Sequence, residues 1–507
     1  MDLVSFLKIR AERYGEKPFL FGEKTSISYR TFDRLTDRIA YGLDKLGMRR
    51  GDHVAVLHPN SVQTLLGYFS IIKAGGVVIP INPVYTPREV RFVLNNSEAK
   101  GLILHEDFSP VIEEIRDEIP LVKNIIVRKG RETIERAVEN AVGASLSTMK
   151  GMDLHPDDAA IMFYTSGTTG SPKGVILTHR NFCFGGPNVA QNYGLREEDV
   201  TIAVLPLVHV FCVASPFFGS LSSGGSVVVL EKFKTELVFE AIAKYKVTWF
   251  PGVPTMFIYL LNGLSENRHD LSSLRMGLSG GASLPVEVLK EWEEKFKAIV
   301  IEVYGLTEST GLVTANPVYG IRKAGSIGIA VSGVSAMVVD KGGNELPRGG
   351  VGELIFKGPN ATRGYFKLPQ ETMEKIRDGW VYTGDHAWRD EDGYFYIVGR
   401  EKELIISGGY NIYPREIEEV LHGFPGVNEV AVIGVPDPTK GEVPKAFVAL
   451  KSGFQVTEEK LLDYCRKNLA PYKIPQIRFM DELPKNTTGK IMKKELPREW
   501  MNPQENK

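Results

Sequence analysis

Apolar and polar positions along the first 250 residues follow helical and strand periods in turn. Apolar residues recur at helical spacing from Phe32 to Leu46 and stop before Gly47, which predicts a helix, and the apolar run at 53–57 predicts a strand. This alternation is typical of parallel sheets covered by helices, so we expect a layered α/β fold. Further helices are expected over 65–74 and 89–94, and further strands over 76–81, 101–104, 227–230 and 247–250.

The pattern changes at about Gly325. Short apolar runs at 335–340 and 352–356 are separated by glycine and proline, which predicts a β-rich subdomain. We place the end of a large N-terminal domain, residues 1–399, after this subdomain.

Residues 400–507 have the pattern of a small, separate α+β domain. A helix is expected to open at Pro414, two strands to follow over 429–433 and 445–450, and a last helix to be capped by Thr457. The chain has no internal repeat or low-complexity tract.

Composition narrows the classes of partner. With 507 residues, 43% hydrophobic and 24% charged, the chain is too long for one hydrophobic core. Its net charge of −1 shows no excess of basic residues that would attract nucleic acid or an anionic membrane. Cys183, Cys212 and Cys465 lack metal or disulfide spacing, which favours a reducing interior, and no signal-peptide pattern opens the chain. We expect a cytoplasmic protein that binds small molecules; homodimerisation and loose association with a membrane surface stay open.

A long uncharged segment lies between Asp199 and Glu231. Pro206 and Pro216 interrupt it, as does the glycine pair at 224–225, so it fits poorly with a membrane-spanning helix. We expect buried strand and helix instead, and no integral membrane segment.

A loop rich in glycine and hydroxyl side chains spans residues 164–174. Apolar runs at 159–163 and 174–177 predict a strand on each side, so the loop is held firmly, unlike an ordinary surface loop. It is not a Walker loop, because no Gly-Lys-Ser/Thr triplet closes it and Pro172 precedes the lysine. Its backbone N–H groups, hydroxyls and lysine suit a polyphosphate. The candidate polyphosphate-binding residues are Thr165, Ser166, Gly167, Thr168, Thr169, Gly170 and Lys173.

Four later segments, at 304–308, 382–385, 399–411 and 484–490, follow this loop in order. Together the five segments resemble the acyl-adenylate-forming (AMP-binding) superfamily, which includes acyl-CoA synthetases, adenylation domains of peptide synthetases and luciferases. Residues 390–399 and 408–418 are similar to long-chain fatty-acid CoA ligases of bacteria and archaea. The resemblance implies two steps: a carboxylate attacks the α-phosphorus of MgATP to give acyl-AMP and pyrophosphate, and coenzyme A then displaces AMP.

The resemblance also implies roles for charged residues. Lys490 would be the central cation that offsets the repulsion between carboxylate and phosphate. Glu308, with Thr165, would hold Mg²⁺ against the phosphates, and Thr307 would bond to the α-phosphate or the acyl oxygen. A solvated, non-catalytic Lys490 is the alternative.

Other matched residues would hold the nucleotide. Tyr304 offers a flat face to adenine. Asp385 is expected to follow a tight Thr-Gly turn and has acceptors for the ribose hydroxyls, and Arg400 would reach the ribose or the phosphates. Core packing for Tyr304 and a turn-forming role for Asp385 remain alternatives. Close approach of backbone to the adenylate is expected at Gly280, Gly281, Ala282 and Gly305, where a simple turn is the alternative.

In this superfamily the small domain is thought to rotate between the two steps. Lys402 matches the hinge position, and Gly408 and Gly409 would line the passage for coenzyme A. The resemblance therefore implies a mobile C-terminal domain.

The uncharged segment between Asp199 and Glu231 indicates which class of carboxylic acid the protein binds. It offers no carboxylate for an amino acid's ammonium group and no Lys or Arg for a second carboxylate, so we predict an acyl-CoA synthetase for a medium- or long-chain fatty acid. Ordinary core packing is the alternative for each pocket residue, and chain length stays open. A ligase for an aromatic or alicyclic acid and an enzyme that loads a carrier protein also remain open. The candidate acyl-pocket residues are His209, Phe211, Phe217 and Phe250.

Overall fold

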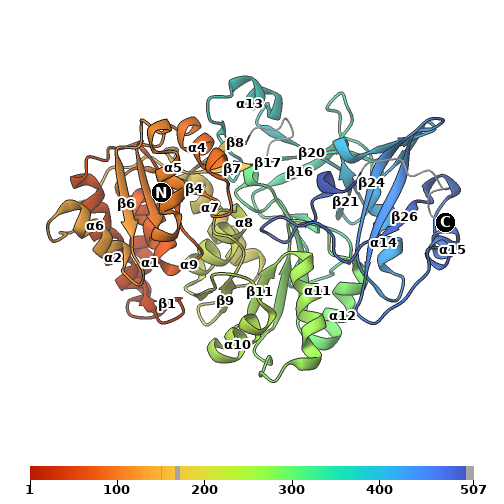
Figure 1. Cartoon of the computed structure of the whole chain (residues 1–507), viewed down its shortest axis with the longest axis horizontal. Helices are drawn as coiled ribbons and strands as arrows, with labels where there is room; N and C mark the ends of the chain where they lie inside the picture. Colours follow the sequence, from red (N-terminus) through yellow and green to blue (C-terminus); the bar gives the residue numbers. More distant parts are fainter. Residues whose placement is uncertain (150, 166–171, 498–507) are drawn as a thin grey trace.

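The computed structural model describes residues 1–149, 151–165 and 172–497, whose strands form four sheets (Figure 1). Three sheets belong to a large N-terminal domain and the fourth to a small C-terminal domain, drawn in blue in Figure 1. The α/β fold expected from the sequence is confirmed.

A seven-stranded sheet has the order β18-β8-β7-β4-β3-β5-β6, in which β7, β4, β3, β5 and β6 run parallel. The predicted alternation of helix and strand is therefore confirmed in this region. The strands are β3 (His53–Leu57), β4 (Val77–Ile81), β5 (Gly101–His105), β6 (Asn124–Arg128), β7 (Ala159–Thr165), β8 (Lys173–Thr178) and β18 (Gly364–Tyr365). The helices are α2 (Tyr29–Lys45), α3 (Val62–Lys73), α4 (Pro87–Asn96), α5 (Ser109–Glu114) and α6 (Ile134–Val142).

Local side-chain contacts explain where these helices begin. The Ser28 side chain caps α2 by accepting a hydrogen bond from the backbone N–H of Thr31. Thr86 and Glu89 form a capping box at the start of α4, with Pro87 in the first turn. The helix predicted over 89–94 is therefore longer than expected, because this capping box and Pro87 start it two residues earlier.

A nine-stranded sheet has the order β15-β14-β13-β12-β11-β9-β10-β1-β2, and its central strands are parallel. Its strands are β1 (Pro18–Phe21), β2 (Ser26–Ser28), β9 (Val200–Ala203), β10 (Ser226–Val229), β11 (Trp249–Gly252), β12 (Met276–Ser279), β13 (Ile299–Tyr304), β14 (Thr314–Ala315) and β15 (Ile329–Ala330). The helices are α1 (Leu3–Tyr14), α7 (His179–Asn192), α8 (Val210–Cys212), α9 (Ser220–Ser223), α10 (Thr235–Tyr245), α11 (Pro254–Gly263) and α12 (Val286–Phe296).

The strand predicted over 247–250 begins two residues later, because Val247, which follows α10, is still part of the hydrogen bonding that closes the end of this helix. The Val247 backbone N–H bonds to the carbonyl of Ile242, and sheet pairing starts at Trp249. Apolar residues on both sides of a helix end hid this boundary in the sequence.

The uncharged segment between Asp199 and Glu231 forms β9, α8, the π-helical segment η3 (Val213–Gly219), α9 and β10. Most of it is buried, as expected. Among the described residues, no helix combines the length and the apolar character needed to cross a membrane.

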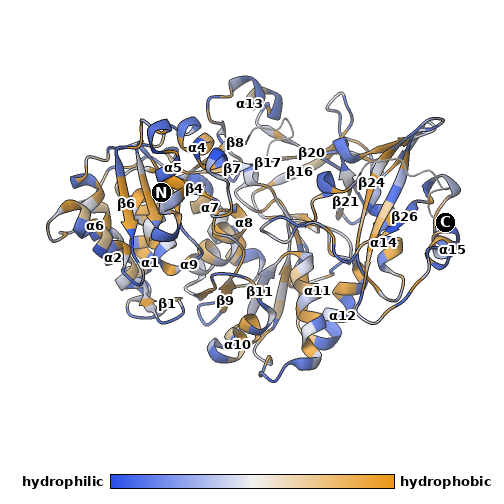
Figure 2. Ribbon diagram, viewed as in Figure 1, coloured by the Kyte–Doolittle hydropathy of each residue, from blue (hydrophilic) through white to orange (hydrophobic). Residues whose placement is uncertain are grey.

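One hydrophobic cluster joins the two large sheets. It contains Val54 and Val78 from the seven-stranded sheet together with Val227 and Val228 from the nine-stranded sheet. Figure 2 shows hydrophobic residues concentrated in strands such as β4 and β6. The two sheets therefore share a core and form a single support for the loops at their edges.

The β-rich subdomain expected after Gly325 is an antiparallel sheet of order β16-β17-β20-β19, with β21 paired to β20. Its strands are β16 (Ser335–Val339), β17 (Gly352–Lys357), β19 (Ile376–Arg377), β20 (Trp380–Arg389) and β21 (Phe395–Arg400), and α13 (Pro369–Lys375) lies beside it.

The C-terminal domain contains the order β23-β22-β25-β24, with β26 paired to β25. Its elements are β22 (Ile405–Ser407), β23 (Tyr410–Ile412), α14 (Pro414–His422), β24 (Val427–Asp437), β25 (Gly441–Leu450), α15 (Glu458–Asn468) and β26 (Gln476–Phe479). The predicted cap is present, since the Thr457 side chain accepts a hydrogen bond from the backbone N–H of Lys460.

Candidate active site

The predicted phosphate loop connects two antiparallel strands, β7 and β8, in which Thr165 lies opposite Lys173. The strands expected on both sides of the loop are confirmed, so its two ends are fixed by sheet hydrogen bonds. Nucleotide binding by Thr165 and Lys173 stays a prediction. The remaining candidates of this loop lie outside the described residues: Ser166, Gly167, Thr168, Thr169 and Gly170.

Tyr365 connects this hairpin to the predicted magnesium ligand. Its hydroxyl donates to Glu308 Oε1 at 2.6 Å, and the Lys173 ammonium lies 5.5 Å from the centre of its ring. Glu308 is buried and follows Thr307 in the short helix η5 (Thr307–Ser309), just beyond β13. No sequence pattern marks Tyr365 as a site residue, because a tyrosine after Gly364 is also an ordinary β-strand residue.

The predicted ribose and adenine residues also meet. Asp385 lies directly opposite Arg400 in the ladder between β20 and β21, and the Arg400 Nε atom is 3.2 Å from Asp385 Oδ1. The Tyr304 hydroxyl donates to the other carboxylate oxygen, Oδ2, at 2.6 Å. Burial, reinforced by the Asp385 charge, raises the pKa of Tyr304, which keeps this hydroxyl protonated as a donor.

Asp385 does not follow a tight turn, contrary to our expectation. Thr383 and Gly384 lie inside β20, where Gly384 has a φ of 77° and its N–H donates to Glu353 Oε1 at 2.8 Å. A left-handed glycine locally distorts the strand, which is why the Thr-Gly pair was taken for a turn.

Packing accounts for two of the predicted glycines. A Cβ atom at Gly305 would lie 1.7 Å from the Gly311 carbonyl oxygen, and one at Gly280 would lie 2.9 Å from Val303 Cγ2. Gly281 has a φ of 81°, and Gly281 and Ala282 are exposed. These contacts require glycine at 305 and 280 without any ligand, so approach to an adenylate stays a prediction.

Lys490 reaches the same site from the C-terminal domain. It ends the segment 484–490, here called the Lys490 loop, and it is half-buried. Burial and the nearby Arg400 guanidinium lower the pKa of Lys490 to about 8, against the opposing effect of the Asp385 and Glu403 carboxylates. The signature segments of the two domains are therefore close enough for their charges to interact.

We expect a pH dependence from this geometry. A lysine of lowered pKa loses its positive charge as the pH rises through about 8, so kcat/KM for ATP in pyrophosphate release should fall above that pH. Lys490→Arg keeps its charge at higher pH and should shift the decline upwards. Pyrophosphate release measured from about pH 6 to pH 10 tests this, and an identical decline in both proteins would contradict it.

The residues predicted for domain movement lie between β21 and β23. Lys402 is exposed in the short helix η6 (Glu401–Glu403). Gly408 and Gly409 form the turn between β22 and β23, with φ of 56° and 86°, and a Cβ atom at either would have no heavy atom within 4 Å. The hinge and the coenzyme A passage stay predictions.

One of the four candidate acyl-pocket residues, Phe211, lies beside the predicted adenylate residue Gly280. Phe211 is partly buried, and its ring lies 3.3 Å from the position of a Cβ atom at Gly280. His209 Nε2 is buried without a hydrogen-bond partner among the described residues. Burial lowers the pKa of His209 to about 4, so its imidazole is neutral at pH 7.

The other two candidates are packed in fully buried aromatic clusters. The Phe217 ring centre lies 5.4 Å from that of Phe19 and 5.5 Å from that of Phe69. The Phe250 ring centre lies 5.7 Å from that of Phe257. Both residues therefore contribute to the core, and a role in an acyl pocket stays a prediction.

The described residues also fit a magnesium ion bound mainly by substrate. They contain no group of three or more His, Cys, Asp or Glu side chains that could hold a metal. The Glu308 carboxylate accepts only the Tyr365 hydroxyl among them. One protein carboxylate completed by phosphate oxygens is a usual Mg²⁺ arrangement.

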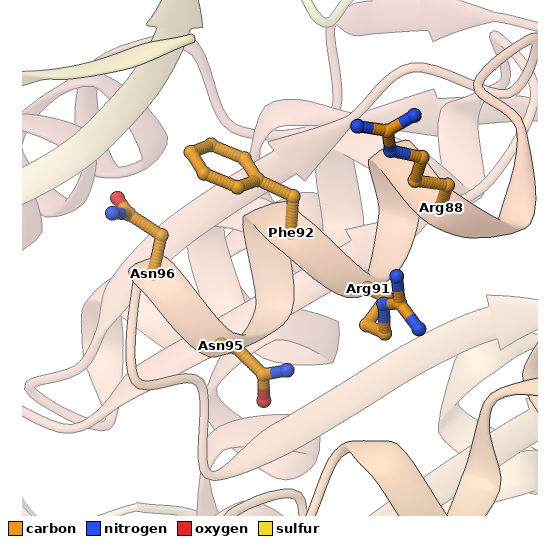
Figure 3. A pocket seen from close by; sticks show the side chains of 5 residues that line it. All are labelled: Arg88, Arg91, Phe92, Asn95 and Asn96. Atoms are coloured by element: carbon orange, nitrogen blue, oxygen red, sulfur yellow. The ribbon is translucent and has the colours of Figure 1, made fainter. Parts of the chain in front are cut away.

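An open cavity of about 470 Å³ lies on α4, and Figure 3 shows that all of its lining side chains come from this one helix. The Tyr164 hydroxyl, from the strand that leads into the phosphate loop, donates to Asn96 Oδ1 at 2.7 Å. No sequence pattern predicts this cavity. Its lining residues are Arg88, Arg91, Phe92, Asn95 and Asn96.

Family models and a known relative match the chain over most of its length. The chain matches the model of the AMP-binding enzyme family over residues 7–366 and that of the AMP-binding enzyme C-terminal domain over residues 416–490. It is 37% identical to a long-chain-fatty-acid–CoA ligase of Bacillus subtilis, an alignment that covers 94% of this chain and 92% of the relative.

Solved structures are similar over nearly the whole length. ATP-bound MatB from Rhodopseudomonas palustris has a TM-score of 0.90 and 33% identity, covering 97% of this chain and 98% of that chain. An anthranilate CoA ligase in complex with anthranoyl-AMP has a TM-score of 0.91 and 30% identity, covering 97% of this chain and 95% of that chain. The chain therefore belongs to the AMP-binding enzyme family and carries both of its domains.

Proposed function

We propose that this acyl-CoA ligase activates a medium- or long-chain fatty acid. The fatty carboxylate attacks the α-phosphorus of ATP, releasing pyrophosphate and forming acyl-AMP, and the thiol of coenzyme A then displaces AMP. The observation that supports this proposal is that the Lys490 loop of the C-terminal domain is held on α11 of the N-terminal domain, where the Thr255 hydroxyl donates to the Gly489 carbonyl at 2.8 Å. In this position Lys490 is close enough to Arg400 and Asp385 for their charges to shift its pKa.

The charges of this site suit the first step. Asp385 accepts hydrogen bonds from the ribose hydroxyls, while Tyr304 and Arg400 hold its carboxylate in place. Lys490, as a cation, offsets the repulsion between the incoming carboxylate and the α-phosphate. Mg²⁺, held by Glu308 and the phosphates, would neutralise charge on the departing pyrophosphate.

The surroundings of the acyl site favour an uncharged chain. No Asp, Glu, Lys or Arg occurs between Asp199 and Glu231, and His209 in this segment is neutral at pH 7. An ammonium group or a second carboxylate would lack a partner there, which costs several kcal/mol on burial. The name of the Bacillus subtilis relative supports the same substrate class.

A second candidate is an aromatic acid. It is favoured by the anthranilate CoA ligase, which has the same fold at 30% identity. Phe211 beside Gly280 offers a flat surface on which either an aryl ring or an alkyl chain can pack.

Pyrophosphate release over a panel of acids tests the proposal. The panel contains fatty acids of graded length, benzoate, anthranilate, a dicarboxylic acid and amino acids, each with and without coenzyme A. We expect release with fatty acids, AMP as the nucleotide product, and thioester only when coenzyme A is present. Uniformly low release with fatty acids beside strong release with an aryl acid would favour the second candidate, and formation of ADP would contradict both.

A further inference from the structure

We propose that Thr255 and Tyr259 of α11 are positioning residues that dock the Lys490 loop for acyl-AMP formation, an inference that rests on the function proposed above. Neither belongs to a segment that carried the family resemblance. They lie four residues apart and thus on one face of the helix. Each contacts one end of the Lys490 loop.

Thr255 holds the end that carries the catalytic lysine. Its side chain is 6% exposed, and its hydroxyl donates to the carbonyl oxygen of Gly489, the residue before Lys490, at 2.8 Å. Gly489 has a φ of 81°, and a Cβ atom there would lie 2.7 Å from Thr255 Oγ1. The two segments approach so closely that the Thr255 hydroxyl directly sets the distance between the Lys490 loop and α11.

Asn486 stiffens the loop from within. Its side-chain oxygen accepts hydrogen bonds from the backbone N–H of Lys490 at 2.9 Å and of Thr488 at 3.0 Å, and its own N–H donates to the Lys490 carbonyl at 2.9 Å. Because the loop is braced in this way, a contact that holds Gly489 also holds the backbone of Lys490.

Tyr259 holds the other end of the loop. Lys485 Nζ donates to the Tyr259 hydroxyl at 3.0 Å. The same ammonium pairs with Glu429 and Glu482 of the C-terminal domain, at 2.8 Å each, and its side chain is 11% exposed. Lys485 is thus fixed within its own domain before it reaches α11, so Tyr259 receives a preorganised donor.

These contacts serve only the step in which Lys490 occupies the site. A rotation of the C-terminal domain that withdraws Lys490 must break the hydrogen bonds to Thr255 and Tyr259, whereas the ion pairs of Lys485 with Glu429 and Glu482 move with their domain. Loss of the docking contacts should therefore slow acyl-AMP formation and spare thioester formation.

Thr255→Val tests this, because it keeps the branched shape and removes the hydroxyl. We expect kcat for pyrophosphate release to fall about five- to tenfold with the KM for ATP unchanged, while thioester formation from supplied acyl-AMP keeps its rate. Thr255→Ser, which retains the hydroxyl, should restore most of the loss. Tyr259→Phe should act in the same direction, by about two- to fivefold.

Asn262→Ala is the matched control. It removes an exposed hydrogen bond from the same helix to Asn428 of the C-terminal domain, away from the Lys490 loop, and should leave both half-reactions unchanged. Equal slowing of both half-reactions by Thr255→Val, or no slowing, would overturn the inference while wild-type activity keeps the proposed function intact. A wild-type protein that releases no pyrophosphate with any acid would overturn both.

Discussion

We expect acyl-AMP formation to fall by about 100- to 1,000-fold when Lys490 is replaced by alanine, because the site then loses the cation that we propose to face the reacting phosphate. Thioester formation from supplied acyl-AMP and coenzyme A should stay near the wild-type rate, since the α-phosphorus is no longer attacked in that step. The two half-reactions are measured separately, as pyrophosphate release without coenzyme A and as AMP release from acyl-AMP with it.

Lys494→Ala is the control for Lys490→Ala, because Lys494 lies four residues further on and is exposed. It should change neither rate. Loss of both half-reactions in Lys490→Ala would contradict a role confined to the first step and would point to a general effect on the fold or on domain docking.

The second large effect is expected at Asp385. Replacement by asparagine keeps the shape but removes the charge that Arg400 and the Tyr304 hydroxyl contact. A charged hydrogen-bond acceptor contributes about 1.5 to 3 kcal/mol, so we expect the KM for ATP to rise about 10- to 100-fold. Titration calorimetry with AMP should show a loss of affinity of the same size.

Asp392→Asn is the matched control for Asp385→Asn. Asp392 lies in the turn between β20 and β21 and its side chain, which pairs with Lys323, is 71% exposed. Exposed pairs of this kind contribute little, so the KM for ATP should not change. An unchanged AMP affinity in Asp385→Asn would exclude this carboxylate from the ribose site.

Periodic hydrophobic patterns predicted most of the parallel strands. The prediction for 53–57 coincides with β3, and those for 76–81 and 101–104 differ from β4 and β5 by one residue at one end. Such strands are buried on both faces, so they are continuous apolar runs between polar loops. The boundaries were less certain where apolar residues continue through a helix end, as at Val247.

The sequence could not predict contacts between residues far apart in the chain. The hydrogen bond from Tyr365 to Glu308 and that from Thr255 to Gly489 depend on how separate elements pack. No local sequence pattern marks Tyr365 or Thr255 for these contacts. For the same reason, the aromatic spacing that suggested an acyl pocket did not separate Phe211, at the edge of the site, from the fully buried Phe217 and Phe250.

The position of Arg400 at the very end of β21 would link nucleotide binding to the proposed rotation of the C-terminal domain. Its partner Asp385 lies opposite it on β20, so a nucleotide bound to this pair would stabilise β21, the last strand before the C-terminal domain. If Lys402 is the hinge, as the family resemblance implies, release of AMP would make the start of the C-terminal domain freer to move. Release of AMP and the return of the C-terminal domain to its starting position would then occur together, without a separate regulatory element.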